Sequence, residues 1–187
     1  MTDIVSHRQK SDLWGSIFMS FKTVKAKELC ANLFHKIDDE WLLICTKDRE
    51  NARINLMTAS WGGFGILWNR EVCFLFVRPQ RHTHKLLLEQ DSFSVLVLPE
   101  AYKPMHKVFG KLSGRDLDKV KETGLTAIEL DGVPAVEEAS LVFTVKKLYE
   151  DELKKDGFLE EALLKNYPAD DFHTVYVCEI KNVYSKE

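Results

Sequence analysis

Residues 57–69, MTASWGGFGILWN, start like a β-strand and then change character. The chain enters through Arg53-Ile54-Asn55-Leu56, narrows to small residues at positions 58–60, and reaches Gly62-Gly63 after Trp61. Strands usually carry bulky residues where they face a core. Small hydroxylated residues followed by paired glycines therefore suggest that a ligand lies against this backbone.

Short apolar runs rich in β-branched and aromatic residues recur along the chain and predict strands. These segments are residues 41–46, 54–61, 72–77, 93–98, 127–130, 141–149 and 173–183. Helical spacing or capping signals predict short helices between them. These segments are residues 24–35, 82–90 with Leu86, Leu87 and Leu88 inward, 100–109 as a helix or an irregular segment, 115–121 capped by Ser113 and stopped by Gly124, and a charged helix-like insertion at 151–168.

Strands outnumber convincing strand-helix-strand units, which favours a mainly β (α+β) fold with an antiparallel barrel over a doubly wound sheet. The length of 187 residues and the 45% hydrophobic content suit a single domain over residues 1–187. Its core is expected at about 41–183, with the helix at 24–35 before it. The P-loop pattern is absent, and Gly62, Gly63 and Gly65 do not complete a dinucleotide-binding fingerprint.

Composition argues against several classes of protein. A net charge of -3 gives no overall attraction to nucleic acid or to an anionic membrane. The N-terminus has no apolar signal core, and no run approaches the roughly 18 apolar residues of a membrane helix. Cys45, Cys73 and Cys178 lie in apolar runs and are interpreted as buried thiols of a reducing compartment, so we expect a cytoplasmic protein. The histidines at 82, 84 and 106 have no metal-ligand spacing, so no metal site is expected.

A second stretch, VRPQRHTHK at residues 77–85, leaves a strand with Arg78 and Arg81 and reaches Thr83 at the start of a predicted helix. Guanidinium groups, a hydroxyl and free backbone N–H groups suit a phosphate. The alternative is a solvated basic turn with Thr83 as a helix cap. A hairpin of 54–61 with 72–77, turning at Gly62-Gly63, would bring residues 58–60 beside this basic turn and create a site for a flat phosphorylated ligand.

Four ordered motifs resemble the flavin reductase-like family, close to its flavoredoxin branch. They are N-x-MTASWGG from Asn55, VRP-x-R-x-T from residue 77, SGRD from Ser113, and H-x-x-YV-x-EI from His173. The resemblance spans residues 41–183 and implies an FMN-binding split β-barrel that works as a homodimer, with the flavin site near the dimer interface.

Carried onto this sequence, the resemblance implies a role for each matching residue. It places the isoalloxazine and ribityl chain along Asn55, Met57, Thr58, Ala59, Ser60 and Trp61, the phosphate on Arg78, Arg81 and Thr83, and the pocket wall at Ser113 and Gly114. It also implies that His173 lies on the substrate side of the flavin as the catalytic residue. A lone histidine at a strand start is more often structural.

The sequence departs from the family pattern at three positions, of which one is Leu112, where a polar residue is frequent. Phe109 stands where relatives commonly have a cysteine, so any redox role of that cysteine is missing here. Cys178 stands where the closing strand often has glycine.

The resemblance implies an FMN-dependent oxidoreductase that takes electrons from NADH or NADPH and delivers them to free flavin, a small acceptor or a redox-protein partner. An FMN-binding or haem-binding electron carrier or sensor without nicotinamide turnover is the alternative. A third hypothesis is an interaction domain that uses the apolar residues Phe64, Ile66, Leu67 and Trp68 as an interface.

Overall fold

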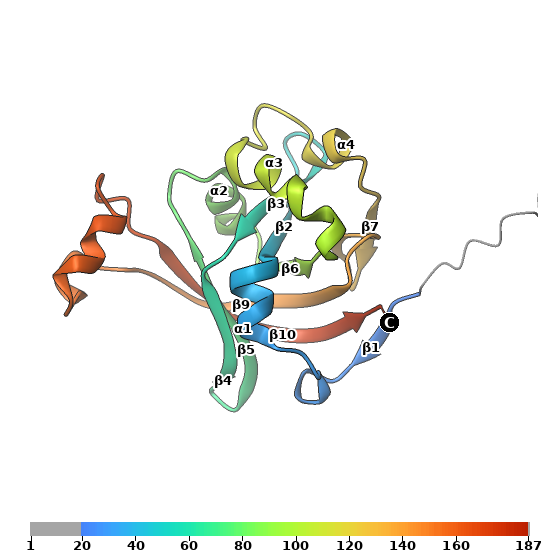
Figure 1. The fold of residues 1–187 in the computed structure, drawn as a ribbon, viewed down its shortest axis with the longest axis horizontal. Helices are drawn as coiled ribbons and strands as arrows, with labels where there is room; N and C mark the ends of the chain where they lie inside the picture. Colours follow the sequence, from blue (N-terminus) through green and yellow to red (C-terminus); the bar gives the residue numbers. More distant parts are fainter. Residues whose placement is uncertain (1–19, 187) are drawn as a thin grey trace, which may run out of the picture.

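The computed structural model describes residues 20–186, which form an antiparallel sheet curled into a split β-barrel with short flanking helices (Figure 1). The strand order is β3-β2-β6-β9-β10-β5-β4, with β1 paired to β10 and β7–β8 as a separate hairpin. The strands are β1 (Lys22–Val24), β2 (Leu42–Asp48), β3 (Arg53–Ala59), β4 (Gly62–Leu67), β5 (Arg70–Val77), β6 (Ser92–Val97), β7 (Ala127–Leu130), β8 (Val133–Val136), β9 (Leu141–Glu152) and β10 (Thr174–Ser185). The predicted mainly β class is confirmed.

Helical segments are short and lie between strands. They are α1 (Leu33–His35), α2 (His82–Leu88), α3 (His106–Lys111), α4 (Lys119–Thr123), the 3-10 turns η1 (Ala26–Glu28), η3 (Glu100–Met105), η4 (Lys155–Gly157) and η5 (Glu161–Asn166), and the π-helical turn η2 (Lys36–Glu40). Within residues 20–186, none of these helices has the length and apolarity to cross a membrane.

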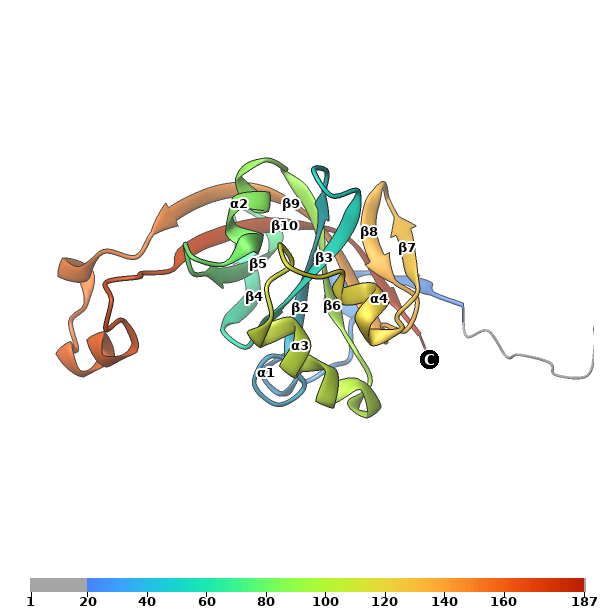
Figure 2. The same cartoon turned by 90° about the horizontal axis from the view of Figure 1, so that it is seen from above.

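Apolar side chains pack on both faces of the sheet. The barrel interior holds Phe93, Phe143 and Tyr176, all buried. The opposite face, with Leu56, is covered by α3, which contributes Phe109, and by α4 and the β7–β8 hairpin (Figure 2). The three cysteines in strands are buried as predicted, whereas Cys30 is exposed.

The β9–β10 pair continues beyond the barrel as a long arm, with residues 153–173 at its end (Figure 1). At this end Phe158, Tyr167 and Phe172 pack together, and the rings of Tyr167 and Phe172 stack 4.8 Å apart. The arm therefore has a small aromatic core of its own.

The predicted hairpin of 54–61 with 72–77 is wrong. β3 pairs with β2, and β5 pairs with β4 and β10. The turn lies instead at Trp68 and Asn69, whose φ values of 51° and 58° suit a tight β-hairpin turn. Gly62 is inside β4, where a Cβ atom would lie 2.7 Å from the carbonyl oxygen of Phe74. The close approach of β5 explains this glycine.

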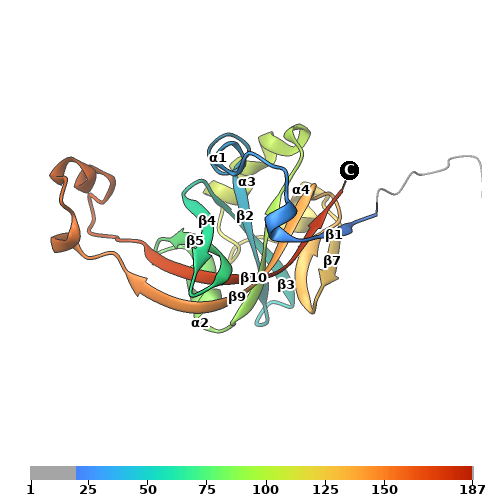
Figure 3. The same ribbon diagram turned by 90° about the horizontal axis from the view of Figure 1, so that it is seen from below.

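The predicted helix over residues 24–35 is also wrong over most of its length. Val24 pairs with Val183 in the sheet, so β1 lies along β10 near the C-terminus (Figure 3). A 3-10 turn follows at Ala26–Glu28, and α-helical structure begins only at Leu33, where the side chain of Asn32 accepts a hydrogen bond from the backbone N–H of His35. Sheet pairing satisfies backbone groups that the helix would have paired internally.

Three further helix predictions need correction. Residues 115–121 are helical only from Lys119, because Asp118 rather than Ser113 caps α4, whereas the stop at Gly124 is confirmed by its φ of 69°. The 151–168 insertion is the end of β9 followed by two 3-10 turns. Leu88 points outward and is 55% exposed. β8 was missed because its four residues include Pro134, which disfavours a strand.

Candidate functional site

A cavity of about 220 Å³ lies where β3, the start of α2 and the segment before α4 meet. Its lining residues come from four separate stretches of the chain: Asn55, Gln80, Arg81, His82, Thr83, Lys111, Leu112, Ser113, Gly114 and Lys119. Five of the predicted binding residues (Asn55, Arg81, Thr83, Ser113 and Gly114) are in this set. The fold thus brings three of the four sequence motifs to one place.

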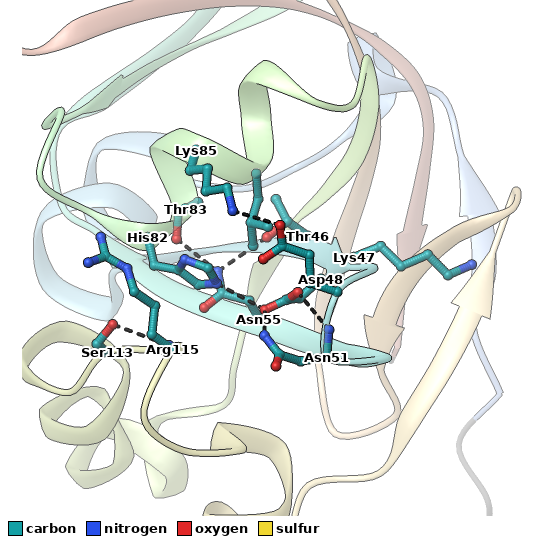
Figure 4. Close-up of polar contacts among 12 residues, drawn as sticks. Thr46, Lys47, Asp48, Asn51, Asn55, His82, Thr83, Lys85, Ser113 and Arg115 are labelled. Atoms are coloured by element: carbon teal, nitrogen blue, oxygen red, sulfur yellow. Dashed lines mark hydrogen bonds and ion pairs between the residues drawn. The ribbon is translucent and has the colours of Figure 1, made fainter.

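Asn55 organises one wall of this cavity (Figure 4). Its amide nitrogen donates to Thr46 Oγ1 at 3.2 Å and to Thr83 Oγ1 at 2.8 Å. The Thr83 hydroxyl keeps its own hydrogen for another acceptor. Asn55 is only 3% exposed, and its Oδ1 has no hydrogen-bond partner. A buried acceptor without a partner is destabilising unless a ligand or a water supplies a donor.

Gly114 is a glycine because of this asparagine. A Cβ atom at position 114 would lie 2.2 Å from Asn55 Oδ1, which is too close for any side chain. Before it, the hydroxyl of Ser113 accepts a hydrogen bond from the N–H of Arg115 at 3.2 Å, so its own hydrogen remains available. The SGRD motif is therefore a tight turn fitted against β3.

Two cations meet at the inner end of the cavity. The Arg81 guanidinium donates to the carbonyls of Gly110 at 2.6 Å and Phe109 at 3.2 Å. The ammonium of Lys119 donates to Leu56 O at 2.8 Å and Phe109 O at 3.1 Å. Within the described part of the chain, neither cation forms an ion pair with a carboxylate.

Lys119 is 3% exposed, and burial together with the charge of Arg81 lowers its pKa to about 8. Burial also lowers the pKa of Arg81. The nearby Arg81 charge contributes only to the shift of Lys119, but both cations are partly or fully buried without a carboxylate partner in the described residues. This arrangement favours binding of an anion. Sequence reasoning missed Lys119, because a buried lysine has no sequence pattern that separates it from a solvated one.

β3 is the last strand of the sheet and offers a free backbone edge. Met57 and Ala59 point into the barrel core and are 3% and 6% exposed. Leu56 O faces away from β2, toward Lys119. Backbone groups alternate in an antiparallel ladder, so Thr58, two residues on, also turns its N–H and C=O away from β2. Ser60 and Trp61 follow the strand, and Trp61 is 46% exposed.

Arg78 does not line the cavity that Arg81 and Thr83 share. It forms an ion pair with Asp171, donates to Asn166 O at 2.7 Å, and lies 5.1 Å from the ring centre of Tyr167. All three partners belong to the arm. The structure thus separates the two arginines of the VRPQR stretch.

His173 lies beside this group and is 7% exposed. Its Nδ1 hydrogen-bonds with the hydroxyl of Tyr167 at 2.9 Å, and its ring lies 5.1 Å from that of Trp61. Burial, with a contribution from the charge of Arg78, lowers the pKa of His173 to about 4, so the imidazole is neutral at physiological pH. Trp61 thus connects the end of β3 with the base of the arm.

The family model of the flavin reductase like domain matches residues 35–187, which is most of the chain, so this protein belongs to that family. No curated protein matches it. Solved structures of several flavoproteins share its fold. One is a flavin reductases-like enzyme from Shewanella baltica with an FMN-binding domain, at a TM-score of 0.65 and 15% identity over 89% of this chain and 78% of that one.

Two further structures are similar over nearly the same length. Flavoredoxin of Desulfovibrio vulgaris has a TM-score of 0.63 and 23% identity, and covers 87% of this chain and 78% of its own. An FMN-binding protein from Thermus thermophilus, determined with bound p-hydroxybenzaldehyde, has a TM-score of 0.62 and 21% identity, and covers 89% and 82%. At these identities the comparison establishes the shared split barrel.

Proposed function

We propose that the protein binds FMN, with its phosphate in the cavity beside Arg81 and Lys119 and its ring system along the free edge of β3. The observation that carries the proposal is the pair of cations without a carboxylate partner at the inner end of a cavity. Thr83 and Ser113 add hydroxyl donors for phosphate oxygens. The FMN-binding relatives of the same fold support this assignment.

The remaining parts of the ligand also find partners of suitable chemistry. Asn55 Oδ1 needs a hydrogen-bond donor, which a ribityl hydroxyl supplies. The outward N–H and C=O of Thr58 suit the polar edge of a heterocycle, and Trp61 offers an apolar face. Bound FMN would supply two-electron redox chemistry, and the protein would hold the ring and control access to it.

We further propose that the activity is oxidation of NADH or NADPH with transfer of the electrons to free flavin, a small acceptor or a redox protein. His173 and Trp61 would form the substrate side of the site, because they lie together at the end of β3 beside the base of the arm. Family membership supports this activity.

Visible spectroscopy of purified protein titrated with FMN tests cofactor binding. We expect saturable flavin binding, and we expect Lys119→Met to weaken it roughly tenfold to a hundredfold because a charge-assisted contact to phosphate is lost. Lys121→Met removes an exposed lysine from the same helix and serves as the control. A Soret band would favour the haem-binding alternative, and failure to bind FMN would refute the proposal.

Anaerobic addition of NADH or NADPH to the FMN-loaded protein tests the enzyme activity separately. We expect one of them to bleach the flavin absorbance after mixing, as followed by stopped-flow or manual spectroscopy. If neither does, the electron-carrier alternative replaces the nicotinamide-dependent one while FMN binding stands.

We also propose a homodimer that covers the exposed apolar residues of β4, the following turn and the arm. Ile66 is 61% exposed, Trp68 55%, Tyr149 47% and Leu163 43%. Exposed apolar residues in such number are typical of an interface. Sedimentation or light scattering at micromolar concentration should give twice the mass of one chain. If the native protein is a dimer and Trp68→Glu is a monomer, the dimer interface includes Trp68. A monomeric native protein would refute the proposed homodimer.

A further inference from the structure

The hydroxyl of Thr58 is held by a histidine that the sequence motifs do not include. His106 lies at the start of α3, is 3% exposed, and its Nδ1 is 2.9 Å from Thr58 Oγ1. α3 packs on one face of β3, so this bond joins the last strand of the sheet to that helix (Figure 2).

Aromatic rings enclose the imidazole of His106. The ring centre of Trp41 lies 5.4 Å away and that of Phe109 5.8 Å away, both in edge-to-face geometry. Lys103 in turn lies 5.1 Å from the ring centre of Trp41. These contacts leave His106 little rotational freedom.

Trp41 adopts an unfavourable backbone conformation at this point, with φ 67° and ψ 140°. A bulky residue at positive φ is strained and persists where the surrounding structure enforces it. Here the strain directs the indole ring against His106. Conformations of this kind gather at functional sites.

The imidazole is neutral. Burial, with the nearby charge of Lys103 as a second cause, lowers the pKa of His106 to about 4. A neutral imidazole has one donor and one acceptor nitrogen, so the bond to Thr58 has a defined direction. In either tautomer one role of the Thr58 hydroxyl is used by His106, and the opposite role is presented to a neighbouring group.

We propose that His106 is a positioning residue that orients the Thr58 hydroxyl toward the flavin ring system. This inference rests on the proposed binding of FMN along β3. The Thr58 hydroxyl lies on the face of β3 that α3 covers, next to the edge where the backbone N–H and C=O of the same residue are exposed to a heterocycle bound there. His106 acts through Thr58 and does not itself contact the ligand.

Four variants test this proposal: His106→Leu, His106→Asn, Thr58→Val and the double variant His106→Leu with Thr58→Val. The amide of asparagine places a polar atom where Nδ1 of histidine lies, so His106→Asn can keep the bond to Thr58. Each variant is titrated with FMN, the visible difference spectrum of the bound flavin is recorded, and thermal unfolding confirms that it is folded.

We expect His106→Leu to weaken FMN binding roughly threefold to tenfold, the value of one hydrogen bond. It should also shift the bound-flavin spectrum in the same way as Thr58→Val. His106→Asn should restore the native affinity and spectrum. Because His106 acts through Thr58, the double variant should bind no more weakly than Thr58→Val alone.

Two results would overturn the inference while leaving FMN binding intact. One is a His106→Leu variant with native affinity and spectrum, and the other is a double variant whose loss is the product of the two single losses. If His106→Leu does not fold, failure of His106→Asn to match the native spectrum is the overturning result. Native protein that binds no FMN would refute the proposed function itself.

Discussion

Lys119 illustrates how the site works at the scale of single residues. Its ammonium group is buried, donates to two carbonyls and has Arg81 as a neighbouring charge. Burial of a charge without a counter-charge is unfavourable, and the lowered pKa records this cost. A bound phosphate would supply the missing negative charge and raise the pKa of Lys119 again.

This linkage predicts a pH dependence of FMN affinity. Free protein loses the Lys119 proton as the pH rises through about 8, whereas the complex retains it, so affinity should fall above pH 8. The limiting slope is roughly tenfold per pH unit, because one proton must then be taken up on binding. Titrations from pH 7 to pH 9.5 measure it. Lys119→Met should abolish this pH dependence of FMN affinity, and Lys121→Met should retain it. If Lys119→Met retains it as well, another group is responsible for the pH dependence.

The arm is the informative feature at the scale of elements. β9 and β10 continue past the barrel, and residues 153–173 have their own aromatic cluster. Arg78 connects this segment to the end of β5 through Asp171, Asn166 and the ring of Tyr167. The arginine therefore holds the arm in place, and its sequence neighbour Arg81 faces the cavity.

We expect Arg78→Ala to loosen the arm. Loss of hydrogen bonds to a charged group, worth about 1.5–3 kcal/mol, should increase the rate of proteolytic cleavage within residues 153–173 by roughly tenfold or more. Lys155→Ala breaks an exposed pair with Asp170 in the same segment and should change little. FMN affinity should fall less in Arg78→Ala than in Arg81→Ala. Equal losses would show that Arg78 also holds the phosphate, as the family resemblance implies.

At the scale of the whole molecule, His106 and His173 make the fold sensitive to acid. Both are buried, and burial lowers the pKa of each to about 4. The unfolded chain has histidine pKa values near 6.5. As the pH falls below 6.5 the unfolded state takes up protons first, so the free energy of unfolding decreases down to about pH 4.

Urea unfolding at pH 7.5 and pH 5 should show this effect. We expect the two histidines together to account for a loss of about 2–3 kcal/mol over this interval, after allowance for solvent screening. Asparagine is neutral at both pH values, so a variant carrying His106→Asn and His173→Asn should lose less stability on acidification. An equal loss in this variant would place the acid sensitivity in other groups.

Much of the fold was predictable from local pattern. Alternating and β-branched runs marked seven of the strands, and Gly124 marked the end of a helix. The strand pairing was not predictable, because Gly62-Gly63 looks like a turn until the close approach of Phe74 O is known. Val24 likewise fitted a helical pattern in the sequence but lies in the sheet. Its partner Val183 is too far along the chain for any local pattern to indicate the pairing.

The sequence by itself determined the family, the strand content and the residue types that suit a phosphate and a flat ligand, because these depend on short motifs and local periodicity. The tertiary structure decided which of those residues meet. It placed Arg81 with Thr83 and Gly114, directed Arg78 to the arm, and added Lys119 and His106. Burial, missing counter-charges and hydrogen-bond partners arise between segments far apart in the chain, so only the folded molecule reveals them.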